Sequence, residues 1–455
     1  MKIISAAHVL TMNKNLEYIA DGAVLVNGQT IAAIDKREKL IQQYPHVEHE
    51  HHPNGLLMPG LINTHCHSGL LRGTAEGLPV WDWLQQFIDP MHRVLLPEDA
   101  KIASYLCYAE ALLSGTTTIV DMWRYMDGSA EAAEQLGIRA VLVPYVAEHP
   151  DHNYFETLKT NEALIQRWHE QANGRINVWV GLEHLFYAEQ PALARIQNMC
   201  QEYQTGFHTH SNESQFDVQE NLKRYGMRPI QTLEKLGMFD VPKCLLAHCV
   251  WLDDDEISLL KYYQVGVAHN PISNMKLASG AAPITKMLAQ GVAVGLGTDG
   301  EKENNNLDMF EEMKTASLLA KFSNLDAAAL DSWSICQMAT QLGAKALGMQ
   351  QQIGSLEVGK QADLIVVDAA TPRMTPLIDH GQLFNLHTNL VHAVQGQDVV
   401  MTMVAGRTVV QNGKLVHADL QQLIDQVNVA APALFKRRAD WLSLRGTSIN
   451  ELQRV

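Results

Sequence analysis

Short apolar runs alternate with amphipathic stretches through the middle of the chain. The runs are bounded by turn residues and have the length of buried strands. In chain order they are Leu57–Thr64, Thr116–Met122, Arg139–Val146, Asn177–His184, Thr205–His210, Cys244–Val250, Val265–Asn270 and Ala293–Asp299. Eight strands that alternate with helices predict an α/β fold, a (β/α)8 barrel. The alternative is an open doubly wound sheet, but that fold usually has a Gly-rich phosphate loop after its first strand, and histidines stand there in this chain.

The stretches between these strands have the pattern of helices. Pro97–Leu113 is the clearest, because proline suits a first helical turn and Gly115 suits the position just past a helix end. Further helices are expected at Glu156–Gln171, Ala192–Tyr203, Asp253–Tyr263, Ala282–Gln290, Leu307–Phe322 and Asp326–Leu347.

Both ends of the chain have a different sequence pattern, which is that of short strands joined by tight turns. In residues 1–58, two apolar runs flank Asn27-Gly28, which is a strong hairpin signal. Residues 355–418 contain similar runs, and neither end has enough strands to bury a sheet alone. We therefore expect 1–58 and 355–418 to form one composite β-sandwich domain. The barrel would span 59–354, and 419–455 would form a C-terminal helical tail.

Composition and charge limit the classes of partner. The chain has 455 residues, 46% of them hydrophobic, and a formal net charge of −15. This charge argues against nucleic acid or an anionic membrane as the main partner. We find no N-terminal signal pattern and no apolar run long enough to cross a bilayer. Six scattered cysteines fit a reducing compartment, so we expect a cytoplasmic protein. We expect its partner to be a small molecule.

Residues that bind metals or move protons stand where the predicted strands end. In a barrel, the active site lies at the C-terminal ends of the strands. His65 and His67 follow the first strand, and strand side chains alternate, so both imidazoles point the same way and can share one metal ion. The matching residues at later strand ends are Glu183, His184, His208, His210, Glu213, His248 and Asp299. This distribution predicts a metal-dependent active site.

Several segments resemble the amidohydrolase superfamily. They are PGLINTHCH at 59–67, HSNE at 210–213, AHC at 247–249 and GTD at 297–299. Two more, 269–277 and 353–364, are typical of the branch that contains methylthioadenosine/S-adenosylhomocysteine deaminases and triazine hydrolases, the chlorohydrolases. The resemblance covers nearly the whole chain and implies a metal-dependent hydrolase barrel.

The resemblance also implies roles for residues of this chain. One divalent metal ion per subunit, zinc or alternatively Fe²⁺, would be held by His65, His67, His210 and Asp299. Glu213 would be the proton shuttle, His248 would orient the attacking water, and Asp299 would take a proton from that water. The chemistry agrees, because three imidazoles and a carboxylate leave a position open for water, whose pKa a metal lowers to about 7. A glutamate that is not a ligand moves the proton in other zinc deaminases.

Two residues near the predicted ligands leave alternatives open. His208-Thr209-His210 is a second His-x-His, but the family spacing His-x-x-Glu selects His210, so His208 either supports a ligand or lies in the core. Two-metal relatives carry a carboxylated lysine at the end of the fourth strand. No lysine stands there in this chain, which favours one metal ion over two. Glu183 stands at that strand end and could bridge a pair of metals.

The predicted substrate contacts are less specific than the metal site. His184 matches a substrate-contacting histidine of the branch, and the side chains of Trp83 and Trp123 can stack on a flat ring. Asn304, in the loop after the last strand, either contacts the substrate or caps the next helix. Nucleoside deaminases of the branch carry a glutamate for the ribose hydroxyls about twenty-five residues after the second histidine. His92 occupies that place here, which argues against ribose recognition and favours a smaller or less polar substrate.

We therefore expect a metal-dependent hydrolytic deaminase of an amino-substituted heteroaromatic ring. Adenine nucleosides, purines, pterins and triazines all present a suitable ring carbon, from which ammonia would leave. Alternatives on the same site are triazine dechlorination or N-dealkylation, and hydrolysis of a cyclic amide. A different class is a non-catalytic barrel used for binding or assembly, but such relatives usually lose metal ligands, and all are present here. The family also makes a homo-oligomer an option.

Overall fold

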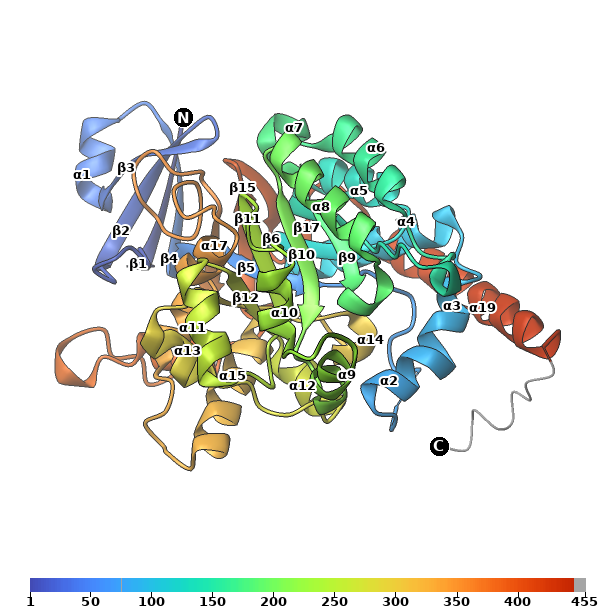
Figure 1. Ribbon diagram of the computed structural model, residues 1–455. Coiled ribbons are helices and arrows are strands. Elements are labelled where there is room, and N and C mark those ends of the chain that lie inside the picture. The colour runs from blue at the N-terminus through green and yellow to red at the C-terminus, as the bar shows by residue number, and fades with distance from the viewer. Residues whose placement is uncertain (75, 446–455) are drawn as a thin grey trace.

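The computed structural model describes residues 1–74 and 76–445, and its centre is a parallel β-barrel (Figure 1). Its strands are β5 (Leu61–Cys66), β6 (Thr116–Trp123), β7 (Arg139–Pro144), β8 (Ile176–Val178), β9 (Val180–His184), β10 (Gly206–Ser211), β11 (Lys243–His248), β12 (Gly266–His269) and β13 (Val294–Leu296). β8 and β9 are one strand interrupted at Trp179. Because β8 pairs with β7 and β9 pairs with β10, this strand closes the ring. The predicted eight-stranded barrel is confirmed.

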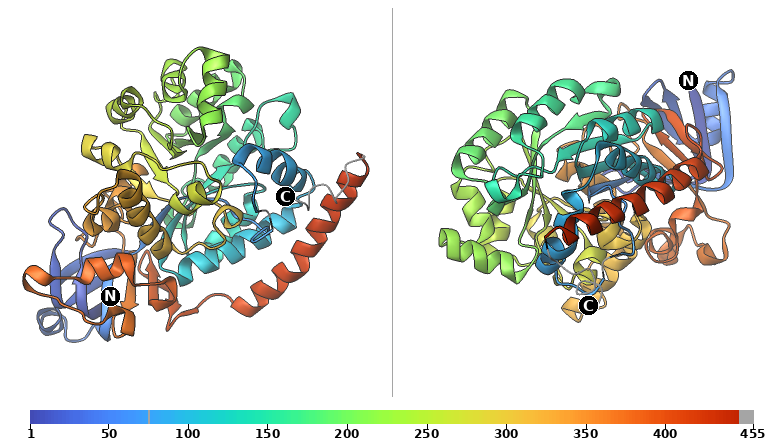
Figure 2. Two further views of the ribbon diagram at one scale, coloured as in Figure 1. Left: turned by 90° about the horizontal axis from the view of Figure 1, so that it is seen from below. Right: turned by 90° about the vertical axis from the view of Figure 1, so that its right-hand side faces the viewer.

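Helices surround the barrel, as Figure 2 shows from two further sides. The longer ones are α4 (Pro97–Leu113), α5 (Asp127–Leu136), α6 (Leu158–Trp168), α8 (Gln190–Glu202), α9 (Gln215–Tyr225), α11 (Asp254–Tyr262) and α15 (Met309–Asn324). Shorter ones include α1 (Arg37–Gln43), α2 (Val80–Trp83), α3 (Asp89–His92), α10 (Pro229–Lys235), α12 (Pro271–Lys276), α13 (Ile284–Gln290), α14 (Glu301–Asn304) and α18 (Leu386–His392). Barrel strands such as β6 are buried along their whole length, which is why they read as continuous apolar runs.

The two chain ends meet in a separate sheet. Its strands are β1 (Lys2–Leu10), β2 (Tyr18–Asn27), β3 (Thr30–Lys36), β4 (Glu48–Pro59), β14 (Leu364–Asp368), β15 (Val399–Val404), β16 (Arg407–Gln411) and β17 (Lys414–Leu415). The order is β17-β16-β15-β14-β4-β1-β2-β3, so the two ends join where β4 pairs with β14. Side chains from both halves, among them Ile4, Val24, Leu364 and Met403, share one apolar core. The predicted hairpin is present, with Gly28 at φ +59° in its turn.

The run predicted as the first barrel strand is divided between the two sheets. Leu57–Pro59 belongs to β4 and pairs with β14, whereas the barrel strand begins at Leu61. Gly60 makes the crossing, where a Cβ atom would lie 2.1 Å from the Thr117 side chain. Glycine therefore fits because the chain passes too close to β6 for any side chain.

The prediction of one helix over Asp326–Leu347 is wrong. The structure has two short helices, α16 (Ser332–Met338) and α17 (Gln341–Ala346). Leu330 takes a positive φ of +53°, and Thr340 has φ −134° and ψ −99°, so neither continues a helix. Leu330 and Thr340 are neither glycine nor proline, so the sequence gives no clear sign of these two backbone breaks.

The tail of the chain forms α19 (Leu420–Ser443), which lies along α4 (Figures 1 and 2). Arg437 fastens it, because its guanidinium donates to the Val94 carbonyl oxygen at 3.1 Å and also pairs with Asp99. The last ten residues of the predicted tail, 446–455, lie outside the described residues. Among the described residues, no helix has both the length and the apolar character needed to span a membrane.

A buried ion pair connects the barrel to the end sheet. Arg139 on β7 donates to both carboxylate oxygens of Asp363, at 2.8 and 3.2 Å, and both side chains are 3% exposed. We expect Arg139→Met to lower the free energy of unfolding by about 3 kcal/mol, because it leaves a buried carboxylate without its cation. Urea unfolding measures this. The double variant with Asp363→Leu should recover part of the loss, and a loss below about 1 kcal/mol in the single variant would contradict the assignment.

Candidate metal centre and active site

The predicted site residues meet at the C-terminal ends of the barrel strands. β5 ends at Cys66 between His65 and His67, β10 carries His210, and β11 ends at His248. Asp299 follows the end of β13 by three residues and has a positive φ of +60°. The backbone amide of Asp299 donates to the His65 carbonyl oxygen at 3.0 Å, which fixes this loop against the first strand.

Three imidazoles and one carboxylate converge at this place. The Asp299 Oδ1 atom lies 3.3 Å from Nε2 of His67 and 3.5 Å from Nε2 of His65. The Nε2 atoms of His67 and His210 lie 3.3 Å apart. Two sets of three side chains lie close enough to hold an ion, His65, His67 and Asp299 in one set and His65, His210 and His248 in the other.

The hydrogen bonds behind His67 and His210 decide which ring nitrogens face the centre. Nδ1 of His67 donates to the Met122 carbonyl oxygen at 2.6 Å, and Nδ1 of His210 donates to the Glu183 carbonyl oxygen at 2.6 Å. Burial holds the pKa of both imidazoles well below the usual range, so they are neutral and each Nε2 carries a lone pair. Two lone pairs that face each other at 3.3 Å fit a shared cation, so these residues fit a divalent metal ion.

His208 fixes the third imidazole by a relay of hydrogen bonds. Its Nδ1 donates to the Leu245 carbonyl oxygen at 2.9 Å, so its Nε2 must accept from Nδ1 of His65 at 2.8 Å. The Nε2 of His65 is then a lone pair, and it is buried without a hydrogen-bond partner. Of the two alternatives for His208, support of a ligand agrees with this geometry.

We expect His208→Phe to weaken metal binding by about 10- to 100-fold, because the phenyl ring fills the space but cannot hold the His65 tautomer. Competition with a chromogenic chelator would measure the affinity. His169→Phe is the control, because His169 binds the Val178 amide and lies away from the centre. An unchanged affinity in the His208 variant would contradict the relay.

Beside this cluster, Glu213 and His248 form a second pair of proton-bearing groups. Nε2 of His248 lies 3.8 Å from Glu213 Oε2 and 3.8 Å from Asp299 Oδ2, while its Nδ1 lies 2.9 Å from the Asn274 amide oxygen. Ser279 donates to the other Glu213 oxygen at 3.2 Å. Burial raises the pKa of Glu213 to about 7, against the opposing effect of His248. This glutamate is therefore suited to hold and release a proton near neutral pH.

Charges set the protonation of the other two groups. Burial lowers the pKa of His248, but the carboxylates of Glu213 and Asp299 outweigh it and raise the pKa above its usual value. Burial alone would raise the pKa of Asp299, but the imidazoles of His65, His67 and His248 around it hold this pKa well below the usual range. Asp299 is thus an ionised carboxylate, further fixed by a hydrogen bond of 2.6 Å from Ser273.

The predicted substrate contacts divide into two groups. Trp83 and His184 line the cleft that contains the cluster. His92 does not line it; its ring stacks on Tyr145 with 5.2 Å between centroids and 5° between planes. Trp123 and Asn304 do not line the cleft either. The Trp123 indole donates to the Ala100 carbonyl oxygen, and the Asn304 amide donates to the Thr298 carbonyl oxygen, so both side chains support the structure around the cleft.

Other cleft residues were not singled out from the sequence. Tyr145 is the second-last residue of the third predicted strand, so its position near a strand end was a signal that could have found it. Asp217 and Glu303 also line the cleft, but each stands on a helix after a strand and carries no spacing signal.

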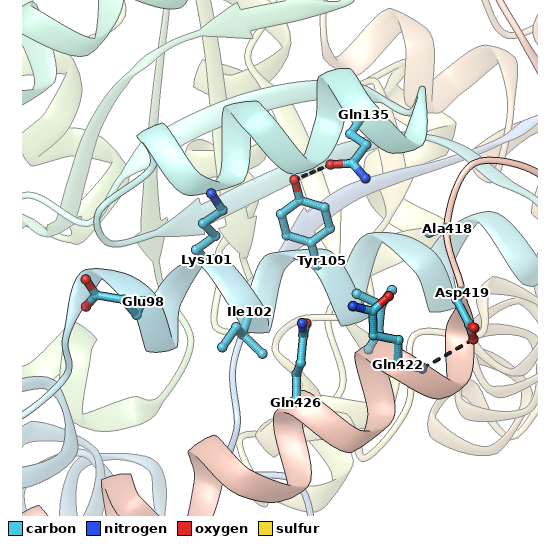
Figure 3. A pocket seen from close by; sticks show the side chains of 10 residues that line it. Glu98, Lys101, Ile102, Tyr105, Gln135, Ala418, Asp419, Gln422 and Gln426 are labelled. Atoms are coloured by element: carbon cyan, nitrogen blue, oxygen red, sulfur yellow. Dashed lines mark hydrogen bonds between the residues drawn. The ribbon is translucent and has the colours of Figure 1, made fainter.

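A second hollow lies between α4 and α19 (Figure 3). It is lined by Ile102, Tyr105 and Gln422, among others, and the Tyr105 hydroxyl donates to Gln135 at 2.7 Å. None of the predicted site residues lines this hollow. It results from the packing of two helices and does not share the chemistry of the barrel cleft.

The barrel and the convergent imidazoles define a class of protein, the metal-dependent barrel hydrolases. Residues 56–409 match the model of the amidohydrolase family, and the chain belongs to this family. A methylthioadenosine/S-adenosylhomocysteine deaminase of Syntrophomonas wolfei is 41% identical over 385 residues, which are 84% of this chain and 87% of that protein. A 5′-deoxyadenosine deaminase of Methanosarcina acetivorans is 38% identical over 439 residues, 96% of this chain and 98% of that protein.

Solved structures support the same placement. An adenosine deaminase of Xanthomonas campestris, solved with bound zinc, superimposes with a TM-score of 0.89 at 29% identity. The match covers 96% of this chain and 98% of that one. The family and the fold predicted from the sequence motifs are therefore confirmed, both for the barrel and for the sheet that the two chain ends share.

Proposed function

We propose that this protein is a metal-dependent hydrolase that deaminates adenine nucleosides, including those modified at the 5′ position. The ring carbon exchanges its amino group for the oxygen of water, and ammonia leaves. The observation that carries the proposal is the arrangement of neutral His67 and His210 nitrogens around an ionised Asp299, with Glu213 and His248 beside them. Relatives at 38–41% identity are named as deaminases of such nucleosides, which supports the choice of substrate.

The metal in this proposal is one zinc ion per subunit, held by His65, His67, His210 and Asp299. Nitrogen-rich donor sets of this kind suit zinc, and the zinc-bound Xanthomonas adenosine deaminase supports the choice. When bound, zinc supplies Lewis-acid activation of water near neutral pH.

The proton transfers are assigned to residues that face the same space. Asp299 takes a proton from the attacking water, and His248 holds that water in place through its Nε2. Glu213 gives its proton to the ring nitrogen, and the proton that Asp299 took from the water then passes through Glu213 to the departing amine. The hydroxyl proton left on the product returns Glu213 to its protonated form. Its Oε2 is available for this role, because Ser279 occupies the other oxygen and the pKa of about 7 allows it to hold a proton at neutral pH.

A cytoplasmic setting is part of the proposal. All six cysteines are free and buried, so no disulfide stabilises the fold. A protein whose cysteines are free is compatible with a reducing compartment such as the cytoplasm.

Ammonia release by zinc-loaded protein tests the proposal. The panel would contain adenosine, 5′-deoxyadenosine, 5′-methylthioadenosine, free adenine, a pterin and an aminotriazine. We expect the nucleosides to have the highest kcat/KM and to yield the corresponding inosines. Release of ammonia from the pterin or triazine alone, or release of chloride from a chlorotriazine without nucleoside turnover, would contradict the proposal.

A further inference from the structure

Three acids that line the cleft, Glu183, Asp217 and Glu303, have no part in the proposed chemistry. Glu303 stands on α14, the short helix that begins two residues after Asp299, and it lines the same cleft as Glu213. Its side chain is only 5% exposed, and its buried Oε2 atom has no hydrogen-bond partner among residues 1–74 and 76–445. A buried carboxylate oxygen without a donor is unfavourable, and because Glu303 lines the cleft, a bound molecule as well as water can supply that donor.

The residues around Glu303 hold this carboxylate in place. Nζ of Lys302 lies 2.9 Å from Oε1, and Lys302 is itself buried, with its ammonium 5.8 Å from the Trp83 ring centroid. A Cβ atom at Gly300 would lie 2.0 Å from Oε2 of Glu303, so glycine leaves the room that this oxygen occupies. Without further donors, burial raises the pKa of Glu303 to about 8 although Lys302 opposes the rise, and hydrogen bonds from a bound molecule would lower it and favour the ionised carboxylate.

Two other acids that line the cleft differ from Glu303. Asp217 accepts a hydrogen bond from the Trp81 indole at 2.9 Å. Glu183 accepts one from the Tyr145 hydroxyl at 3.3 Å and keeps one free oxygen, but burial raises its pKa well above the usual range, and no described Lys or Arg forms an ion pair with it. Among these three acids, Glu303 alone combines a free oxygen with an adjacent buried ammonium group.

We propose that Glu303 forms a subsite for the vicinal hydroxyls of the substrate's sugar. This inference rests on the proposed function. A vicinal diol offers two O–H donors to one carboxylate. Oε2 is free to accept the first, and Oε1 has a second lone pair for the other beside Lys302.

The subsite resolves the question that His92 raised. The family resemblance implies a ribose-binding glutamate at that position, whereas His92 stacks on Tyr145 and does not line the cleft. In this proposal Glu303, which reaches the same cleft from α14, supplies that carboxylate. Loss of the one glutamate therefore does not require loss of sugar recognition.

The test compares adenosine with 2′,3′-dideoxyadenosine in wild type and Glu303→Gln. Glutamine keeps the size but removes the charge and one acceptor. We expect kcat/KM for adenosine to fall about 10- to 100-fold, mainly through KM, because hydrogen bonds to a charged group are lost. The value for the dideoxy compound should change by no more than about threefold, because it makes no such bonds.

Glu301→Gln is the matched control. Glu301 is a buried glutamate on the same helix, but its Oε1 accepts from the Leu71 amide at 2.9 Å and it does not line the cleft. We expect it to keep the preference for adenosine. Glu303→Asp retains the charge on a shorter side chain and should keep more of that preference than Glu303→Gln.

The outcomes separate the two proposals. Equal losses for both substrates in Glu303→Gln, or no loss for either, would overturn the subsite and leave the deaminase intact. Wild-type protein that deaminates neither nucleoside would overturn the proposed function and the subsite with it. If Glu303→Gln fails to fold, the wild type still decides, because equal kcat/KM for adenosine and the dideoxy compound contradicts a diol subsite.

Discussion

We expect the Glu213→Gln variant to lose about 10²- to 10⁴-fold in kcat, the usual contribution of general acid–base catalysis. Glutamine has the same shape and can still accept the hydrogen bond from Ser279, but it cannot carry a proton between water and the ring. The substrate should therefore bind almost as before, and KM should change little. Steady-state ammonia release measures both constants.

The control for this variant is Glu202→Gln, an exposed glutamate at the end of α8. It should have wild-type kinetics. Zinc content and melting temperature of the Glu213 variant should match those of wild type, because Glu213 is not assigned as a ligand. A kcat within tenfold of wild type, with metal bound, would remove Glu213 from the proton transfers.

Removal of the metal is expected to abolish ammonia release and to lower the melting temperature. Without a cation, lone pairs on His67 and His210 face each other at 3.3 Å beside the ionised Asp299. A cation that binds only the folded state stabilises that state by mass action. Dialysis against a chelator, followed by titration with zinc, measures the recovery of both activity and thermal stability.

The most specific part of this prediction is the number of zinc ions per subunit that restores activity. Activity should return in full at one zinc ion per subunit, and Mg²⁺ should restore little, because it prefers oxygen donors to imidazoles. His210→Ala should bind zinc weakly and stay inactive. Full activity in metal-free protein, or a requirement for two ions, would contradict the proposed centre.

The barrel was predictable because its strands are buried on both faces. Runs such as Thr116–Met122 and Arg139–Val146 therefore stand out from the amphipathic helices between them, and α4 has the predicted bounds of Pro97–Leu113. The assignment of Leu57–Pro59 to the other sheet was not predictable from its apolar character, because both sheets bury those residues. Only the close approach at Gly60 separates them.

The site was predictable where strand ends carry it. His65, His67, His210 and His248 all follow from the rule that barrel chemistry lies at the C-terminal ends of strands. The relay through His208 and the free oxygen of Glu303 depend on hydrogen bonds between distant segments, which spacing does not encode.

The isotopic fate of water tests the central claim most directly. Zinc-loaded protein would act on 5′-deoxyadenosine in H₂¹⁸O, and mass spectrometry would locate the label. We predict 5′-deoxyinosine with one heavy oxygen on the purine ring and one ammonia released per product. Free adenine with label on the sugar, or a product without label, would contradict hydrolytic deamination at the ring carbon.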